Sequence, residues 1–345
     1  MVLFLGFALV TLGWTLSPPV GRFRELTGAT APPLEVLRPE ARGVLRPPEV
    51  WLVETKTSYE IYSNGLRIET HGAVHEAPRK YFLIPKPESP DDNPMSHLPW
   101  RTETAPAGIV YHTTESHIAP FRSTETQTLQ RLAQGVLSYV RQARSYHYLI
   151  DRFGRVHRVV DEKSIAHHSG WSVWADARHI YLNLNDSFLG VAFEAQTTPQ
   201  DGSESINPAQ VRAGQMITEM LRSKYQIPAE NCVTHAQVSV NPDNFLVGAH
   251  TDWAQRFPFA AFGLPDNYSI PLPSITLFGF QYDNLYWRMS EASLWKSLLW
   301  ANEQLRQSAA QRGVRLPAYR AILNRRYLEL LEVSRKQKTE EGNQR

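Results

Sequence analysis

The chain has 345 residues, of which 42% are apolar and 20% charged, so it can form one large globular domain or two ordinary ones. The formal net charge of +2 at pH 7 gives no electrostatic support for a nucleic-acid partner, and we predict none. A single cysteine, Cys232, excludes an internal disulfide and a metal site built from several cysteines.

The first predicted element is an apolar N-terminal run. Residues 2–16 are almost wholly apolar, and Ser17-Pro18-Pro19 ends the run. A bilayer-spanning helix needs about 20 residues, so the run fits the apolar part of an export signal better. No lysine or arginine precedes it, which keeps a buried N-terminal helix as the alternative. We predict an exported protein of the cell envelope, periplasmic or extracellular, with this segment either cleaved or kept as a membrane tether.

Residues 1–31 are thus a signal-like segment or anchor with its linker, and residues 32–103 are predicted to be a β-rich extension. In this extension, Asn64-Gly65 separates two runs of alternating β-branched and aromatic residues, which is a strong hairpin signal. The extension could be a small accessory unit or a set of additional strands of the main sheet.

From residue 104 to 265 the pattern changes to mixed α and β. Strands are predicted over 107–113 and 188–196, two more surround a tight turn at Phe153-Gly154, and helices are predicted over 124–144 and 207–228. Residues 266–345 form a predicted C-terminal loop and helical tail, with helices near 285–311 and 317–335. We expect the tryptophans of this tail to pack against the rest of the protein.

Histidines and carboxylates gather in three segments of this middle region. His112 ends the first strand, "AHHSG" occupies 166–170, and residues 232–259 contain His235, His250 and Asp252. Two histidines, one carboxylate and a water are a common catalytic zinc set. The spacing is long-range, so each segment alone is weak evidence for a metal site.

The order of the segments over residues 105–262 resembles the type 2 family of zinc N-acetylmuramoyl-L-alanine amidases, which includes the peptidoglycan recognition proteins. The shared pattern is a strand ending in His-Thr, a helix, "YHYLIDRFGRVHRVV", a His-Ser-Gly, an apolar strand with glycine, a helix, Thr-His and Thr-Asp-Trp. The resemblance implies a central mixed β-sheet flanked by helices, with one zinc in a groove that binds peptidoglycan.

The resemblance also implies the zinc ligands. His112 and His235 match the two ligand histidines of the family, and Asp252 matches the third ligand. His250 falls where the family often has a lysine that stabilises the transition state, so we expect it to act on the oxyanion. No Pro-Gly follows Asp252, which leaves His250 open as the third ligand instead.

Other site residues follow from the same resemblance. Many bacterial members have a glutamate where this chain has Ala192, and Glu194 lies two residues further on the same predicted strand face. Glu194 is therefore our candidate general base, or else a carboxylate of the rim. His168 matches a family histidine near the substrate, and Tyr146 and His147 belong to the strand beside the groove, so we expect all three to contact substrate.

The sequence thus predicts a zinc-dependent hydrolase that cleaves the carbon–nitrogen bond between N-acetylmuramic acid and L-alanine in peptidoglycan or muropeptides. A non-catalytic peptidoglycan-binding module of the same fold is the alternative. The presence of all three ligand residues favours the enzyme.

Overall fold

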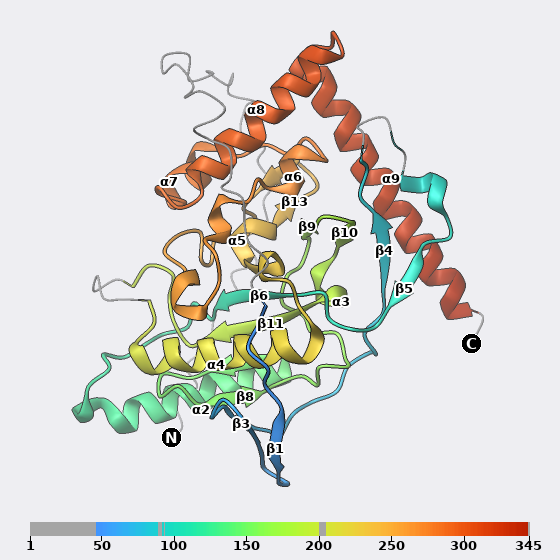
Figure 1. The fold of residues 1–345 in the computed structure, drawn as a ribbon. Helices are drawn as coiled ribbons and strands as arrows, with labels where there is room; N and C mark the ends of the chain where they lie inside the picture. Colours follow the sequence, from blue (N-terminus) through green and yellow to red (C-terminus); the bar gives the residue numbers. More distant parts are fainter. Residues whose placement is uncertain (1–45, 89–91, 93, 200–204, 344–345) are drawn as a thin grey trace, which may run out of the picture.

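The computed structural model describes residues 46–88, 92, 94–199 and 205–343, with side chains to residue 339 (Figure 1). The predicted signal-like segment lies outside the described residues. Within the described part of the chain, no helix combines the length and the apolar composition that crossing a membrane requires.

An eight-stranded mixed sheet forms the centre of the molecule. In spatial order its strands are β1 (Leu52–Thr55), β2 (Tyr59–Tyr62), β3 (Arg67–Glu69), β8 (Val156–Arg158), β7 (Tyr148–Ile150), β11 (Phe188–Phe193), β6 (Gly108–Thr113) and β12 (Cys232–Thr234). The strands β7, β11, β6 and β12 run parallel, whereas β8 is antiparallel to β7. The predicted mixed sheet is confirmed.

The β-rich extension supplies three strands of this sheet. β2 and β3 form the hairpin predicted at Asn64-Gly65, where Gly65 has a φ of +85°. β3 then pairs in parallel with β8 of the middle region. The extension is therefore continuous with the main sheet.

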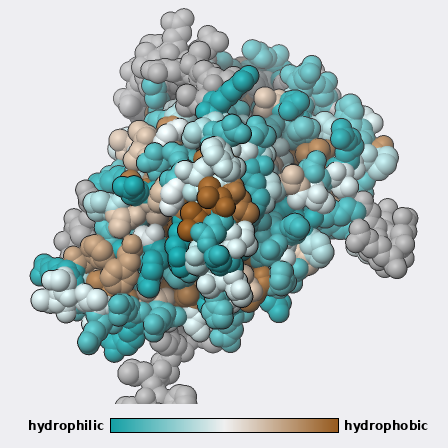
Figure 2. Space-filling view, turned by 60° about the horizontal axis from the view of Figure 1, so that its bottom comes forward, coloured by the Kyte–Doolittle hydropathy of each residue, from teal (hydrophilic) through white to brown (hydrophobic). Residues whose placement is uncertain are grey.

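The outer strand β1 carries exposed apolar side chains, namely Trp51 just before it and Leu52 and Val53 within it. Figure 2 brings the lower side of the molecule forward, the side on which β1 lies in Figure 1, and shows a hydrophobic patch among hydrophilic atoms. An ion pair between Lys56 and Glu54 adds charge to this edge. Charged side chains are a common protection of an edge strand against pairing with another chain.

Helices cover both faces of the sheet. The helices are α2 (Thr126–Gln142), α3 (Leu184–Ser187), α4 (Pro208–Tyr225), α5 (His235–Val238), α6 (Pro273–Thr276), α7 (Asn284–Met289), α8 (Trp295–Gln311) and α9 (Leu316–Asn343). α4 begins at a capping box formed by Asn207 and Gln210 and packs on the face that carries Tyr111. α2 packs through Val140 on the opposite face, against Ala192.

A smaller sheet covers part of that opposite face. It consists of β5 (Arg101–Glu103), β4 (Tyr81–Pro85), β10 (His179–Leu182) and β9 (Val173–Ala175), and a hairpin of β13 (Val240–Asn241) and β14 (Leu246–Val247) lies after α5. Trp174 and Tyr181 of the smaller sheet pack against Val110 of β6 and Val233 of β12. The smaller sheet thus covers one part of this face, and loops surround the C-terminal ends of β6 and β12.

The C-terminal tail differs from the prediction in one respect. The single helix expected near 285–311 is two helices, because the chain turns between α7 and α8, where Glu291 has a φ of +43°. Trp287 and Trp295 stack across this turn with their ring centroids 4.8 Å apart. One hydrophobic cluster includes Ile68, Phe193 and Leu298, one from each predicted region. We therefore propose that the three regions fold as one unit.

Candidate metal centre

Two neighbouring parallel strands deliver the two histidines. His112 lies near the end of β6, a strand whose six residues are all buried, so its backbone is held firmly. His235 is the first residue of α5, directly after β12, and Thr234 and Gln237 form a capping box that fixes this start. Because β6 and β12 pair in parallel, both imidazoles reach the same edge of the sheet.

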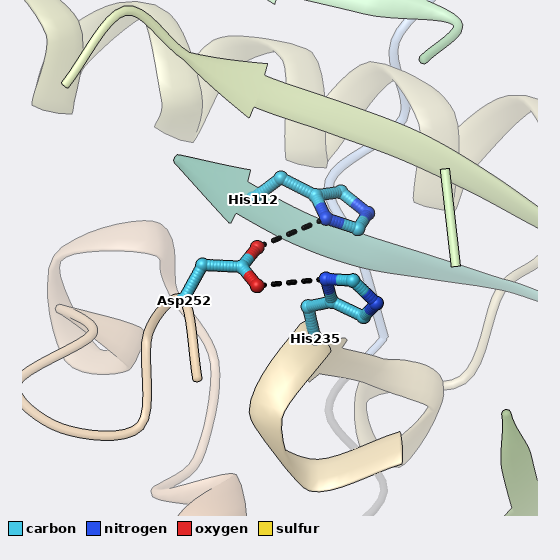
Figure 3. A group of neighbouring side chains, drawn as sticks. All are labelled: His112, His235 and Asp252. Atoms are coloured by element: carbon cyan, nitrogen blue, oxygen red, sulfur yellow. Dashed lines mark hydrogen bonds and ion pairs between the residues drawn. The ribbon is translucent and has the colours of Figure 1, made fainter. Parts of the chain in front are cut away.

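Asp252 comes from the loop that follows the β13–β14 hairpin. Two main-chain contacts hold this loop in place: the Ala236 N–H donates to the Asp252 carbonyl at 3.2 Å, and the Trp253 N–H donates to Thr197 Oγ1 at 3.0 Å. The Asp252 carboxylate therefore points between the two histidines, as Figure 3 shows.

The three side chains form a compact group. One ligand atom of each lies within 4.8 Å of the others. Asp252 Oδ2 is 3.1 Å from His112 Nδ1, and Asp252 Oδ1 is 2.7 Å from His235 Nδ1. Side-chain exposure is 1% for His112 and 10% for Asp252, so the group is screened from water but open at one side.

Hydrogen bonds on the side away from Asp252 indicate which ring nitrogen of His235 and of His112 carries the hydrogen. His235 Nε2 lies 3.4 Å from the carbonyl oxygen of Ser169, and His168 Nε2 lies 3.3 Å from the carbonyl oxygen of Phe188. A carbonyl can only accept, so each Nε2 is the protonated one. The neutral His168 ring then accepts at Nδ1 from His112 Nε2, at 3.1 Å. The Nδ1 atoms of His112 and His235 both face the Asp252 carboxylate.

This donor set fits a divalent metal ion. Burial lowers the pKa of His112 to about 4, so the ring is neutral at pH 7. Although burial alone would raise the pKa of Asp252, the nearby His235 and His112 hold it well below its usual value, so Asp252 is ionised. Two imidazoles and a carboxylate, with a hydrogen bond behind each ring, match the ligand set of a catalytic zinc site.

Two further predicted residues border this group. The Tyr146 ring centroid lies 5.0 Å from that of His112, and the tyrosine is half-buried, with a φ of +61°. The His250 ring stacks on His235 with centroids 4.6 Å apart and is exposed to solvent. His250 is not part of the compact group, so the geometry favours Asp252 as the third ligand.

Two of the predicted substrate residues lie behind the group. His168 is 7% exposed and His147 is fully buried. Burial and the neighbouring charges lower the pKa of both well below the usual value, so both rings are neutral. In this arrangement they support His112, and neither presents an open surface to a substrate.

Glu194 is buried at the end of β11, and its carboxylate faces the turn between β7 and β8. Its Oε2 accepts from the Arg152 N–H at 3.1 Å, and Oε1 has no partner among the described residues. Burial, helped by the nearby Asp151, raises the pKa of Glu194 to about 7, although the hydrogen bond from the Arg152 N–H opposes this rise. Ala192, rather than Glu194, is the direct neighbour of His112 in the sheet register.

Sequence reasoning missed two groups that support the centre. One is the Ser169 carbonyl, a main-chain atom that no side-chain pattern reveals. The other is Arg79, a buried side chain from the extension that contacts His147. An arginine inside the otherwise ordinary run "APRKY" gives no signal that it is buried.

Residues 102–255 match the model of a family described as N-acetylmuramoyl-L-alanine amidase. This segment of the chain belongs to the type 2 amidase family. The matched segment contains His112, His235 and Asp252 and ends just after the last of them, whereas most of the extension and the whole C-terminal tail lie outside it. No curated protein matches the chain.

The solved structures that are similar to this chain are distant from it in sequence. An N-acetylmuramyl-L-alanine amidase of E. coli, AmiD, in complex with anhydro-N-acetylmuramic acid-L-Ala-D-gamma-Glu-L-Lys, is 19% identical over 60% of this chain and 90% of its own, with a TM-score of 0.39. AmpDh3 of Pseudomonas aeruginosa in complex with an anhydromuramic pentapeptide is 21% identical over 48% and 64%, with a TM-score of 0.32. The Drosophila peptidoglycan recognition protein SD is 17% identical over 50% and 85%, also at 0.32.

Proposed function

We propose that the chain is a zinc-dependent N-acetylmuramoyl-L-alanine amidase that acts on peptidoglycan or muropeptides. The observation that carries this proposal is the convergence of His112 Nδ1, His235 Nδ1 and the Asp252 carboxylate within one family segment. A zinc ion held there would polarise the scissile carbonyl and make water a better nucleophile at neutral pH. Because the substrate lies in the cell envelope, we also propose that the apolar residues 2–16 direct export.

The chain's own residues would act on the proton and the charge. Burial raises the pKa of Tyr146, so its phenol stays protonated and can donate a hydrogen bond to an oxyanion beside the metal site. Burial and His235 lower the pKa of His250, so it would donate as a neutral ring N–H. The pKa of Glu194 suits a general base, but its carboxylate faces the β7–β8 turn, so that role stays a prediction.

The decisive test is to incubate the full chain with defined muropeptides and identify the products by mass spectrometry. We expect free stem peptide and an intact sugar, loss of both after treatment with a chelator, and recovery when zinc is added. The Asp252→Ala variant serves as the matched control and should remain inactive with added zinc. Cleavage that persists without metal, or at a sugar–sugar bond, would reject the proposal.

One observation favours the alternative, a module that binds peptidoglycan without cleaving it. The direct neighbour of His112 on the site face is Ala192, which cannot take up a proton. If the zinc-loaded chain binds muropeptides tightly and releases no peptide over hours, the binding module is the better description. Adding the carboxylate with Ala192→Glu would then be expected to produce cleavage.

A further inference from the structure

Arg79 occupies an unusual position for an arginine. It precedes β4 in the extension, before the family segment begins, and only 2% of it is exposed. Four main-chain carbonyls accept hydrogen bonds from its guanidinium: those of Asp186 at 2.9 Å, Glu162 and Ser164 at 3.1 Å, and Phe188 at 3.2 Å. Burying a cation is unfavourable unless it is hydrogen-bonded, and this set of carbonyls supplies that compensation.

Two of these carbonyls also hold the histidines behind the metal centre. The Gly190 N–H donates to His147 Nδ1 at 3.0 Å, so the hydrogen of this neutral ring is on Nε2. That Nε2 lies 3.1 Å from the Ser164 carbonyl, which also accepts from Arg79 Nη2 at 3.1 Å. The 2.7 Å between Nη2 and Nε2 is then an approach of two donors that share this acceptor, and not a hydrogen bond. Arg79 therefore fixes the acceptor on which the tautomer of His147 depends.

The second shared carbonyl belongs to Phe188, which accepts from both Arg79 Nη1 and His168 Nε2. His168 also packs edge-on against His147, with ring centroids 5.7 Å apart. Gly190 allows this packing, because a Cβ there would lie 2.6 Å from His168 Cγ. His168 is thus confined between Phe188, His147 and Gly190, with Nδ1 directed at His112.

We propose that Arg79 is a positioning residue of the metal centre, which acts through the Ser164 and Phe188 carbonyls, His147 and His168 to hold His112 Nδ1 toward the metal. The inference rests on the metal site of the proposed function. It goes beyond that function because it makes metal affinity depend on a residue that the family segment does not contain. The extension would then be a working part of the centre.

The test compares Arg79→Met with Arg67→Met, a control in the same extension whose guanidinium is half exposed and pairs with Glu69. Zinc affinity is measured on the full chain by competition with a chromophoric chelator, with circular dichroism as the check of folding. We expect zinc binding to weaken about ten- to hundredfold in Arg79→Met and to be unchanged in Arg67→Met, as for groups that orient a metal ligand.

A second readout separates positioning from a general loss of structure. Nitrogen-15 NMR of the zinc-free protein reports which ring nitrogen of His112 carries the hydrogen; we expect Nε2 in the unchanged chain and a mixture in Arg79→Met. Arg79→Lys keeps the charge with fewer donors, and its tautomer ratio decides the question if the methionine variant does not fold.

Unchanged zinc affinity and an unchanged His112 tautomer in a folded Arg79 variant would overturn the inference. Neither measurement uses substrate, so a chain that binds zinc but cleaves nothing would refute the proposed function and leave the inference standing. A chain that binds no zinc at His112 would refute both.

Discussion

The buried Glu162 and the largely buried Asp252 differ in how their charge is neutralised. Glu162 lies near α4, and both of its carboxylate oxygens have partners. It pairs with Lys224 at 2.6 Å and with Arg158 at 3.2 Å, and it accepts hydrogen bonds from the hydroxyls of Tyr148 and Tyr225. Burial alone would raise its pKa, but Lys224 and Arg158 bring it down to about 2. The charge of Glu162 is therefore neutralised by side chains of the protein itself.

Asp252 has a similar burial but different partners. Its two histidine contacts, His112 and His235, face it with their Nδ1 atoms at 3.1 and 2.7 Å. The same chain therefore contains one carboxylate that pairs with a fixed lysine and arginine and one whose histidine partners could also hold a metal ion. This difference separates a structural ion cluster from a candidate metal centre, although both carboxylates have a lowered pKa.

The largest expected effect, on zinc affinity and activity, comes from removing the Asp252 carboxylate. Asp252→Ala deletes one of three ligands, so we expect zinc affinity and amidase activity to fall by more than about a hundredfold while the fold is kept. His250→Ala is the matched comparison and should retain zinc. Metal content after dialysis against chelator measures both variants, and loss of zinc only from the His250 variant would reverse the ligand assignment.

Removing the Glu162 carboxylate should lower the stability of the fold and leave zinc binding unchanged. Glu162→Gln removes the carboxylate that pairs with Lys224 and Arg158. Because Lys224 is 41% exposed and Arg158 keeps its pair with Glu60, we expect a loss of about 1–3 kcal/mol, less than for a fully buried pair. Urea denaturation of the zinc-free protein measures the loss, and zinc affinity of the folded fraction should not change. A variant with full stability and weakened zinc binding would contradict the separation between the two clusters.

Removing the Tyr146 hydroxyl should slow catalysis without changing zinc affinity. Tyr146→Phe keeps the ring that packs on His112 and removes one hydrogen-bond donor, so we expect kcat to fall about ten- to hundredfold. Steady-state kinetics on a defined muropeptide give kcat, and chelator competition gives zinc affinity, which should equal that of the unchanged chain. Tyr139→Phe, a more exposed tyrosine on α2, is the control. Unchanged kcat in Tyr146→Phe would remove the phenol from the mechanism.

Much of the fold follows from local sequence signals. The hairpin at Asn64-Gly65, the turn at Phe153-Gly154 and the start of α4 at Asn207 each depend on a few neighbouring residues. The break between α7 and α8 did not show in the sequence, because apolar spacing continues through it. Joining β3 to β8 is a long-range pairing that no local pattern contains.

The candidate site likewise has features that the sequence predicted and features that it did not. The strand end at His112 and the motif order predicted which residues come together as possible ligands. The pattern could not give ring orientation, so His147 and His168, expected at the substrate, are instead enclosed behind His112. It also placed Glu194 on the site face by alternation, although the carboxylate turns toward Arg152 after the strand ends.

Replacing Glu194 is expected to change the pH dependence of stability without changing zinc binding, which tests whether the Glu194 charge belongs to either cluster. Burial raises its pKa from 4.5 to about 7, so the folded state favours the protonated form. Its contribution to stability is therefore full below pH 4.5 and is lost as the pH rises through 7. Glu194→Gln lacks this dependence, so its free energy of unfolding relative to the unchanged chain should rise by about 3 kcal/mol between pH 4.5 and pH 8. Urea denaturation at both pH values measures the difference, and parallel pH profiles would mean that Glu194 is ionised in the folded protein. A loss of kcat in this folded variant, with zinc affinity unchanged, would place Glu194 in the reaction despite its distance in sequence register from His112.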